Sequence, residues 1–176
     1  PILHLSAHYP FGNSEAIPAG KVNLYEKKIR NAMKEGILAG FPVHGIYVSI
    51  FDGKEHPVDS KPIAFETAGR EAFKLAFADA GPVLEEPIYT VKITVPEEYM
   101  GDVIGDLNSR RGQIQGMEAR AGAQSITAFV PLSEMFGYST TLRSATQGRA
   151  TYSMEFKHYA EAPRNVAEAI VASRAK

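Results

Sequence analysis

The second half of the chain shows the clearest pattern of apolar and polar positions. Over 88–95, Val91, Ile93 and Val95 alternate with Lys92 and Thr94, and this period of two predicts a strand. Apolar residues at helical spacing follow, and the two kinds of pattern then repeat. We predict further strands over 113–119, 125–131 and 150–159, and helices over 97–109, from 133 to near 147, and over 165–173.

The two halves of this region resemble each other in sequence. Val95-Pro96, Met100 and Leu107 recur 35 residues later as Val130-Pro131, Met135 and Leu142. Two β-α-β halves in succession are typical of the split βαβ, or ferredoxin-like, sandwich. The pattern therefore predicts an antiparallel sheet of four strands, with two helices on one face and the other face open.

The first half of the chain predicts a smaller mixed unit. A helical pattern begins at Asn23 and ends at Gly36 or Gly40. Alternation over 43–51 predicts a strand. A second helical pattern follows Asp59-Ser60, with apolar residues at helical spacing up to Ala80.

The boundary between the two units is predicted after residue 81. The stretch 81–87 has two prolines and no periodicity, which is typical of a linker. We therefore expect one domain over 1–81, with residues 1–22 the hardest to interpret, and a second domain with a C-terminal helix over 82–176.

The composition of the chain excludes several classes of function. A net charge of −1 excludes a general attraction to nucleic acid, so any RNA contact requires a local patch. The absence of cysteine excludes disulfides and thiolate nucleophiles. No apolar run approaches the roughly 20 residues that span a bilayer, so we expect a cytoplasmic protein without a membrane partner. The chain begins at Pro1 without a signal peptide, and we expect it to be a piece of a longer protein.

The motifs of catalysis are missing from the sequence. It contains neither a Gly-x-x-x-x-Gly-Lys-Ser/Thr phosphate loop nor a Gly-x-Ser-x-Gly elbow. His4 and His8 have the spacing of zinc ligands on a helix, but their segment predicts strand and loop. Glu97 and Glu98 could perform acid–base work, yet a first helical turn favours carboxylates for its dipole alone. We therefore predict no catalytic or metal site and no enzymatic activity of this segment.

Arginine-bearing polar residues lie at the predicted ends of the two equivalent helices. Arginine forks suit phosphate oxygens, and glycine allows close approach of an RNA backbone. If the two helix ends converge, they form one RNA-binding surface; alternatively, the arginines satisfy the helix dipoles. Met135 is assigned to the core, and either Phe136 or Tyr138 is expected to be exposed for contact. The candidate residues are Arg110, Arg111, Gly112, Phe136, Tyr138, Arg143, Ser144, Gln147, Gly148 and Arg149.

These residues also carry a resemblance to a known family. Residues 82–172 resemble the carboxy-terminal domain, domain V, of elongation factor G. The residues before them resemble domain IV of that factor more loosely, and no match is seen over 1–22, where the family has its tip loop. The segments that carry the resemblance are 97–112, 131–138, 142–150 and 152–156 for domain V, and 33–36, 39–43, 52–53, 58–60 and 64–65 for domain IV.

The resemblance implies an α+β protein, in which a partial ribosomal-protein-S5-domain-2-like α/β unit precedes the ferredoxin-like domain. It implies a monomeric translational GTPase that promotes translocation of tRNA and mRNA through the ribosome during protein synthesis. Domain V would contact large-subunit RNA near the sarcin–ricin loop and the stalk base, and domain IV would contact tRNA and mRNA. GTP and Mg²⁺ would be bound by other domains, and no cofactor is expected in this segment. Two alternatives stay open: a paralogous GTPase of ribosome protection or recycling, and a redesigned interaction domain with no ribosomal role.

Overall fold

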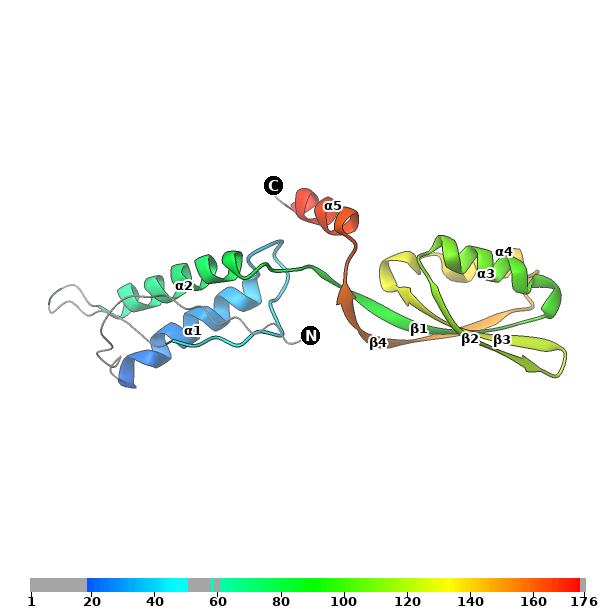
Figure 1. The fold of residues 1–176 in the computed structure, drawn as a ribbon, viewed down its shortest axis with the longest axis horizontal. Helices are drawn as coiled ribbons and strands as arrows, with labels where there is room; N and C mark the ends of the chain where they lie inside the picture. Colours follow the sequence, from blue (N-terminus) through cyan, green and yellow to red (C-terminus); the bar gives the residue numbers. More distant parts are fainter. Residues whose placement is uncertain (1–18, 51–57, 59–60, 175–176) are drawn as a thin grey trace. The chain divides into compact units, whose positions relative to one another are not determined.

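The chain folds into two compact units. The computed structural model describes residues 19–50, 58 and 61–174 (Figure 1). One unit comprises Pro1–Val83 together with Arg164–Lys176, and the other comprises Leu84–Pro163. The division falls within the predicted linker. The last helix, however, groups with the first unit, whereas the sequence pattern had assigned it to the second domain.

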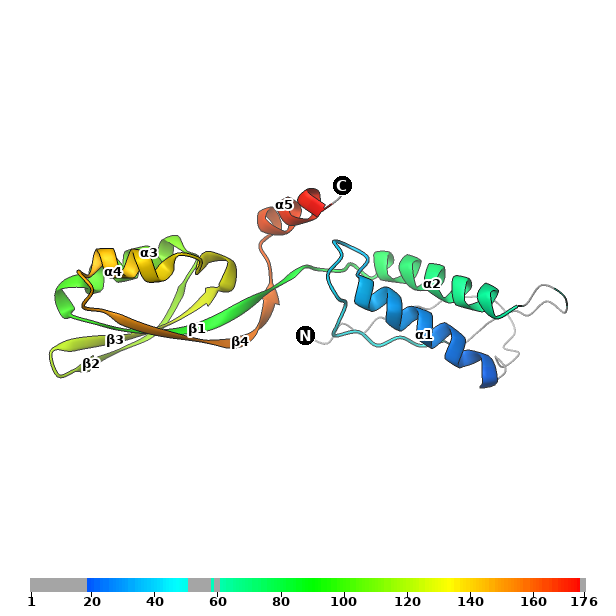
Figure 2. The same cartoon turned by 180° about the vertical axis from the view of Figure 1, so that it is seen from behind.

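The second unit contains one sheet of four strands, β1 (Glu85–Val95), β2 (Gln113–Arg120), β3 (Ala123–Pro131) and β4 (Thr151–Glu161). The strand order is β2-β3-β1-β4, and every neighbouring pair is antiparallel. Helices α3 (Met100–Ser109) and α4 (Tyr138–Ala145) each follow a short 3-10 turn, η1 (Glu97–Tyr99) and η2 (Leu132–Glu134). Both helices lie on the same side of the sheet (Figures 1 and 2). The predicted split βαβ fold is therefore confirmed.

The core of this unit lies between the sheet and the two helices. Alternate residues of β1 and β3 point into it, and their register places Val91 opposite Ala128 and Ile93 opposite Ile126. Each such large aliphatic side chain contributes about 1.5–3 kcal/mol to folding by its burial. Met135 is buried in this core as predicted. The largest fully buried hydrophobic side chains are Val91, Ile93, Val95, Val103, Leu107, Ile126, Val130 and Tyr138.

Helix α3 ends in a compact hydrogen-bonded turn. The Gly112 N–H donates to the Leu107 carbonyl at 2.8 Å, and the Arg111 N–H donates to the Asn108 carbonyl at 3.2 Å. This pair of bonds is a Schellman motif. In this motif the residue just before the final N–H donor, here Gly112, adopts a left-handed backbone. Arg111 occupies that position with a φ of 57°.

Helix α4 ends in a similar way. The Gly148 N–H donates to the Arg143 carbonyl at 2.8 Å, and Gln147 has a φ of 52°. The same turn recurs 36 residues later, one residue beyond the 35-residue sequence repeat, with Gln147-Gly148 in the place of Arg111-Gly112. A shared turn closes both helices at equivalent points of the fold.

The first unit is built around helices α1 (Ala19–Glu35) and α2 (Pro62–Asp79), which pack together, and also contains α5 (Arg164–Arg174). Gly69 makes the close packing possible, since a Cβ there would lie 2.9 Å from Cδ1 of Tyr25. The Arg174 guanidinium donates to the Ala39 carbonyl at 3.3 Å and lies 4.0 Å from the centre of the Phe41 ring. These contacts explain why α5 belongs to this unit. The core that α1 and α2 share comprises Tyr25, Ile29, Ala32, Phe65, Phe73 and Phe77.

Two predictions for the first unit differ from the structure. Helix α1 begins at Ala19, ahead of the predicted start at Asn23. The predicted strand over 43–51 is not formed in its described part, 43–50, where only Ile46 takes part in an isolated bridge. An alternating pattern forms a strand only where neighbouring strands pair with it, and no described strand pairs with this segment. The two predicted helices of this unit are confirmed as α1 and α2.

Candidate nucleic-acid interface

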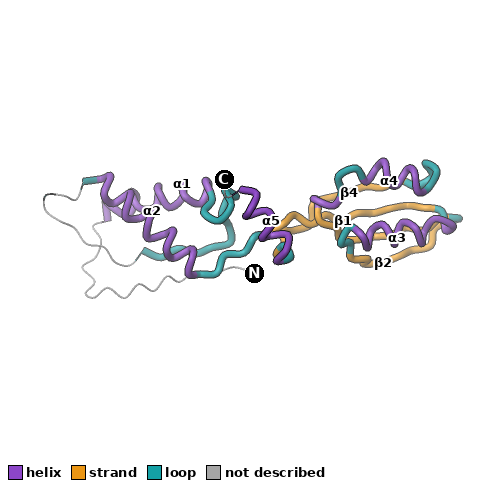
Figure 3. Tube along the Cα trace, turned by 90° about the horizontal axis from the view of Figure 1, so that it is seen from above, coloured by secondary structure: helices purple, strands orange, loops and turns teal. Residues whose placement is uncertain are grey.

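The predicted contact residues lie at two separate places on the second unit. Arg110, at the end of α3, donates to the Glu134 carbonyl and to Thr141 Oγ1 at the start of α4. Arg149, after the end of α4, pairs with Glu98 in η1, the turn that precedes α3. The expected convergence of the two helix ends is therefore wrong. Strands β1 and β3 are antiparallel, so the helices that run back along them are antiparallel too and lie side by side over the sheet (Figure 3).

Arg110 is engaged in contacts within the unit. Its Nε donates to Asp106 Oδ2 at 2.8 Å, its Nη1 to the Glu134 carbonyl and its Nη2 to Thr141 Oγ1 at 3.2 Å. The guanidinium also lies 5.0 Å from the centre of the Tyr138 ring. All three nitrogens of the guanidinium thus donate to acceptors of the same unit.

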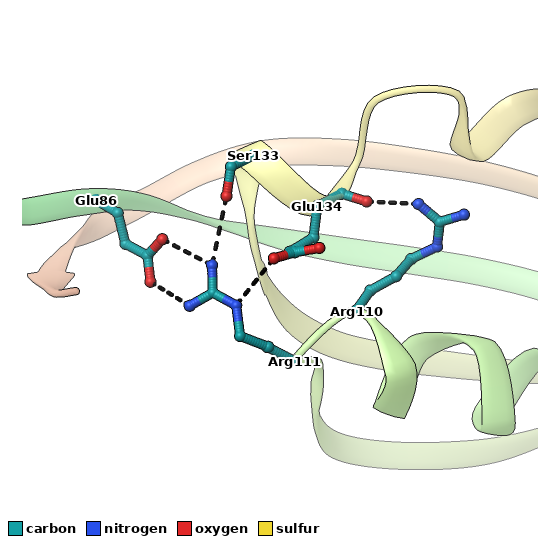
Figure 4. A network of polar contacts seen from close by, with 5 residues as sticks. All are labelled: Glu86, Arg110, Arg111, Ser133 and Glu134. Carbon is teal, nitrogen blue, oxygen red and sulfur yellow. Dashed lines mark hydrogen bonds and ion pairs between the residues drawn. The ribbon is translucent and has the colours of Figure 1, made fainter. Parts of the chain in front are cut away.

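Arg111 is the centre of a network that joins three segments (Figure 4). Its Nη1 and Nη2 donate to the two carboxylate oxygens of Glu86 at 2.7 and 2.9 Å, and its Nε donates to Glu134 Oε1 at 3.0 Å. Nη2 also reaches Ser133 Oγ at 3.4 Å. The hydrogen bond to Glu86, more than any other cause, raises the pKa of Arg111 above its ordinary value. The geometry gives Arg110 and Arg111 a structural role, and their predicted RNA contact has no support in it.

The two aromatic candidates have opposite environments. The Phe136 side chain is 79% exposed, whereas Tyr138 is 1% exposed. The Tyr138 ring packs edge-on against Tyr152, with 5.1 Å between ring centres. Of the pair, only Phe136 is therefore at the surface, and Tyr138 belongs to the core.

The Tyr138 hydroxyl is buried, and no described residue provides it with a hydrogen-bond partner. Burial raises the pKa of this hydroxyl well above its ordinary value, so the group keeps its proton.

Because an unsatisfied buried polar group costs about 1–3 kcal/mol, Tyr138→Phe should raise the free energy of unfolding by about 1 kcal/mol. Urea denaturation of both proteins measures the change. Tyr138→Leu, which also removes the ring, should destabilise the protein, and a less stable Tyr138→Phe would contradict the prediction.

The second place is the C-terminal end of α4. Arg143 has no ion pair with any carboxylate among the described residues, and Gly148 has a left-handed backbone with a φ of 76°. The Arg149 guanidinium pairs with Glu98 and lies 5.6 Å from the centre of the Tyr99 ring. The candidate residues here, all exposed, are Arg143, Ser144, Gln147, Gly148 and Arg149.

Thr146 anchors the turn that carries these residues. It is the one buried polar residue of the described chain, and its hydroxyl donates to the Leu142 carbonyl at 2.7 Å. The same oxygen accepts the Ala150 N–H at 3.3 Å. The side chain thus ties the last turn of α4 to the start of β4, which fixes the backbone between Arg143 and Arg149.

The segment from 138 to 150 has no acidic residue and two arginines, and its exposed side chains also offer hydroxyl and amide groups. The η1 turn and the first turn of α3 are acidic, with Glu97, Glu98 and Asp102, and Glu98 pairs with Arg149 at the end of α4. Guanidinium, hydroxyl and amide donors are the groups that bind phosphate oxygens and ribose hydroxyls. The end of α4 therefore presents donors of the kind that bind a phosphodiester backbone.

Other kinds of site find no support in the described residues. They contain no group of three or more histidine, aspartate or glutamate side chains that could hold a metal ion, and His4 and His8 lie outside them. The sequence contains no Gly-x-x-x-x-Gly-Lys-Ser/Thr loop of the kind that cradles the phosphates of a nucleotide. None of the described helices is long and apolar enough to cross a membrane.

Comparison with known proteins agrees with this architecture. The family model of the elongation factor G C-terminus matches residues 83–170, and that of elongation factor G domain IV matches residues 13–81. A crystal structure of a protein from Thermus thermophilus is similar with a TM-score of 0.76 and 44% sequence identity. The similarity covers 90% of this chain and 24% of that one, so this chain spans about a quarter of the length of that protein.

These matches define the class as an α+β segment of a translation factor. The chain belongs to the elongation factor G family, as the resemblance had implied. One detail differs from the expectation: the domain IV match begins at residue 13, so it includes residues 13–22, for which no match was expected.

Proposed function

We propose that the second unit binds ribosomal RNA as part of an elongation factor G-like protein that promotes translocation of tRNA and mRNA. The observation that carries this proposal is the exposed end of α4, whose own segment, 138–150, contains two arginines and no acidic residue. It offers two arginines beside a glycine turn, on a backbone fixed by the buried Thr146. The proposed contact residues are Arg143, Ser144, Gln147, Gly148 and Arg149, with RNA of the large subunit as the partner.

The first unit would contribute contacts to tRNA and mRNA. Helix α1 has five basic and two acidic residues, and Lys27 and Lys34 are exposed on it. A helix with such an excess of positive charge attracts a polyanion without reading its sequence. GTP and Mg²⁺, which the family uses, would be held outside residues 1–176.

The proposal predicts a specific loss of RNA affinity. Arg143→Ala combined with Arg149→Ala should weaken binding to ribosomes about tenfold or more. It should also lower the slope of log affinity against log salt by roughly 1.5–2, since about one phosphate contact is lost per arginine. Co-sedimentation of residues 1–176 with ribosomes over a series of salt concentrations measures both quantities.

A matched control removes the same charge elsewhere on the unit. Arg120→Ala combined with Lys157→Ala changes two exposed cations of β2 and β4, and we expect little change in affinity. An unchanged affinity and slope in the first variant would refute the α4 interface. An equal loss in both variants would show that only net charge matters.

A further inference from the structure

Arg149 differs from Arg143 in having a carboxylate partner from another element. Glu98, in η1, pairs with the Arg149 guanidinium, and the Tyr99 ring lies beneath the same group with 5.6 Å to its centre. The two charged side chains are 55% and 57% exposed, so an incoming ligand can reach the pair. Arg149 is therefore held from two sides at the surface, by one charged and one aromatic neighbour.

The carboxylate of Glu98 has the chemistry of the ligand that the surface is proposed to bind. Carboxylate and phosphate oxygens accept the same hydrogen bonds from a guanidinium fork. An exposed ion pair is weak and exchanges readily with a stronger partner. The Tyr99 ring, in contrast, attracts the guanidinium through the face of the ring. This contact leaves the N–H edge of the guanidinium free for an anion.

We propose that Glu98 is an internal competitor that occupies Arg149 until an RNA phosphate displaces it. This inference rests on the proposed function of the α4 end and assigns a specificity-determining residue to it. In the free protein, the Arg149 edge is paired with Glu98. On binding, a phosphate takes the place of the carboxylate while Tyr99 keeps the guanidinium in position. Only RNA whose other contacts are well placed offsets the loss of the ion pair, so Glu98 suppresses binding of unrelated RNA.

The adjacent residue provides a matched control. Glu97 lies in the same 3-10 turn and is exposed, but no ion pair joins it to Arg149. Glu97→Gln and Glu98→Gln therefore remove the same charge from neighbouring positions, and only Glu98→Gln frees Arg149. The difference between the two variants isolates the ion pair from general electrostatics.

The test measures equilibrium binding of residues 1–176 to a large-subunit RNA hairpin and to an unrelated RNA duplex of equal length. Glu98→Gln should tighten binding about three- to tenfold relative to Glu97→Gln, with the larger gain for the unrelated duplex. In an Arg149→Ala background the two variants should bind equally. The NMR signal of the Arg149 Nε–H should shift towards its RNA-bound position in free Glu98→Gln and stay unchanged in Glu97→Gln.

The outcomes separate this inference from the proposed function. If the unmodified chain binds neither RNA, both fall together. If it binds RNA and Arg149→Ala weakens that binding, but Glu98→Gln and Glu97→Gln behave alike, the interface stands and the competitor role is overturned. A difference that persists in the Arg149→Ala background also overturns it, because Glu98 would then act on another group.

Discussion

Replacing Arg111 by alanine should lower the free energy of unfolding of the second unit by about 2–3 kcal/mol. Breaking a fully buried ion pair by removing one partner costs about 3–5 kcal/mol, and this pair is only partly buried, with side-chain exposures of 29% for Arg111 and 12% for Glu86. The substitution leaves the carboxylates of Glu86 and Glu134 without the cation between them. The left-handed backbone at this position is strained for arginine and alanine alike, so it adds nothing to the difference between them.

Native-state hydrogen exchange of the β1 and β3 amides reports the opening free energy of this unit without interference from the first. Arg120→Ala is the control, because its pair with Glu118 is exposed and 3.9 Å long; we expect a change below about 0.5 kcal/mol. Arg111→Gly loses the same ion pairs but suits the backbone, so it should be less destabilising than Arg111→Ala. Equal effects of Arg111→Ala and Arg120→Ala would show that the network contributes nothing.

The sequence predicted the second unit well because its signals are local. Alternation through Val91, Ile93 and Val95 indicates which face of β1 is buried, and β3 and β4 pair with this strand on its two sides. The strand predicted over 43–51 rested on the same kind of signal, but its formation depends on pairing with distant residues. Local pattern was sufficient in the first case and insufficient in the second.

The division of the arginines into internal and exposed groups could not be predicted from local pattern. The acceptors of Arg111, Glu86 and Glu134, lie 25 and 23 residues away in the sequence, and Thr141 lies 31 residues from Arg110. No spacing rule reveals such partners. The opposed direction of the two helix ends, in contrast, follows from the predicted fold itself, because antiparallel β1 and β3 require antiparallel helices.

Two glycine-to-alanine substitutions in and after α3 should have effects of opposite sign. At Gly112, a Cβ would lie 2.6 Å from the Leu107 carbonyl oxygen and 3.1 Å from its carbon. The Leu107 side chain is fully buried, so its backbone cannot move away freely. Overpacking of this kind costs about 1–3 kcal/mol, and we expect Gly112→Ala to lie near the upper end because it also weakens the bond that closes the helix.

At Gly105, a Cβ would meet nothing within 4 Å. Alanine in the interior of a helix is more favourable than glycine by about 0.8–1 kcal/mol, so Gly105→Ala should stabilise the unit by nearly that amount. Hydrogen exchange of the same β1 and β3 amides measures both variants, and shifts in the same direction would contradict the prediction.

The pair of variants also decides the role of Gly112, which the sequence analysis placed among the RNA contacts. If Gly112→Ala keeps its stability but loses RNA affinity, Gly112 is a contact residue; if it loses stability, its place is in the helix end that the fold requires.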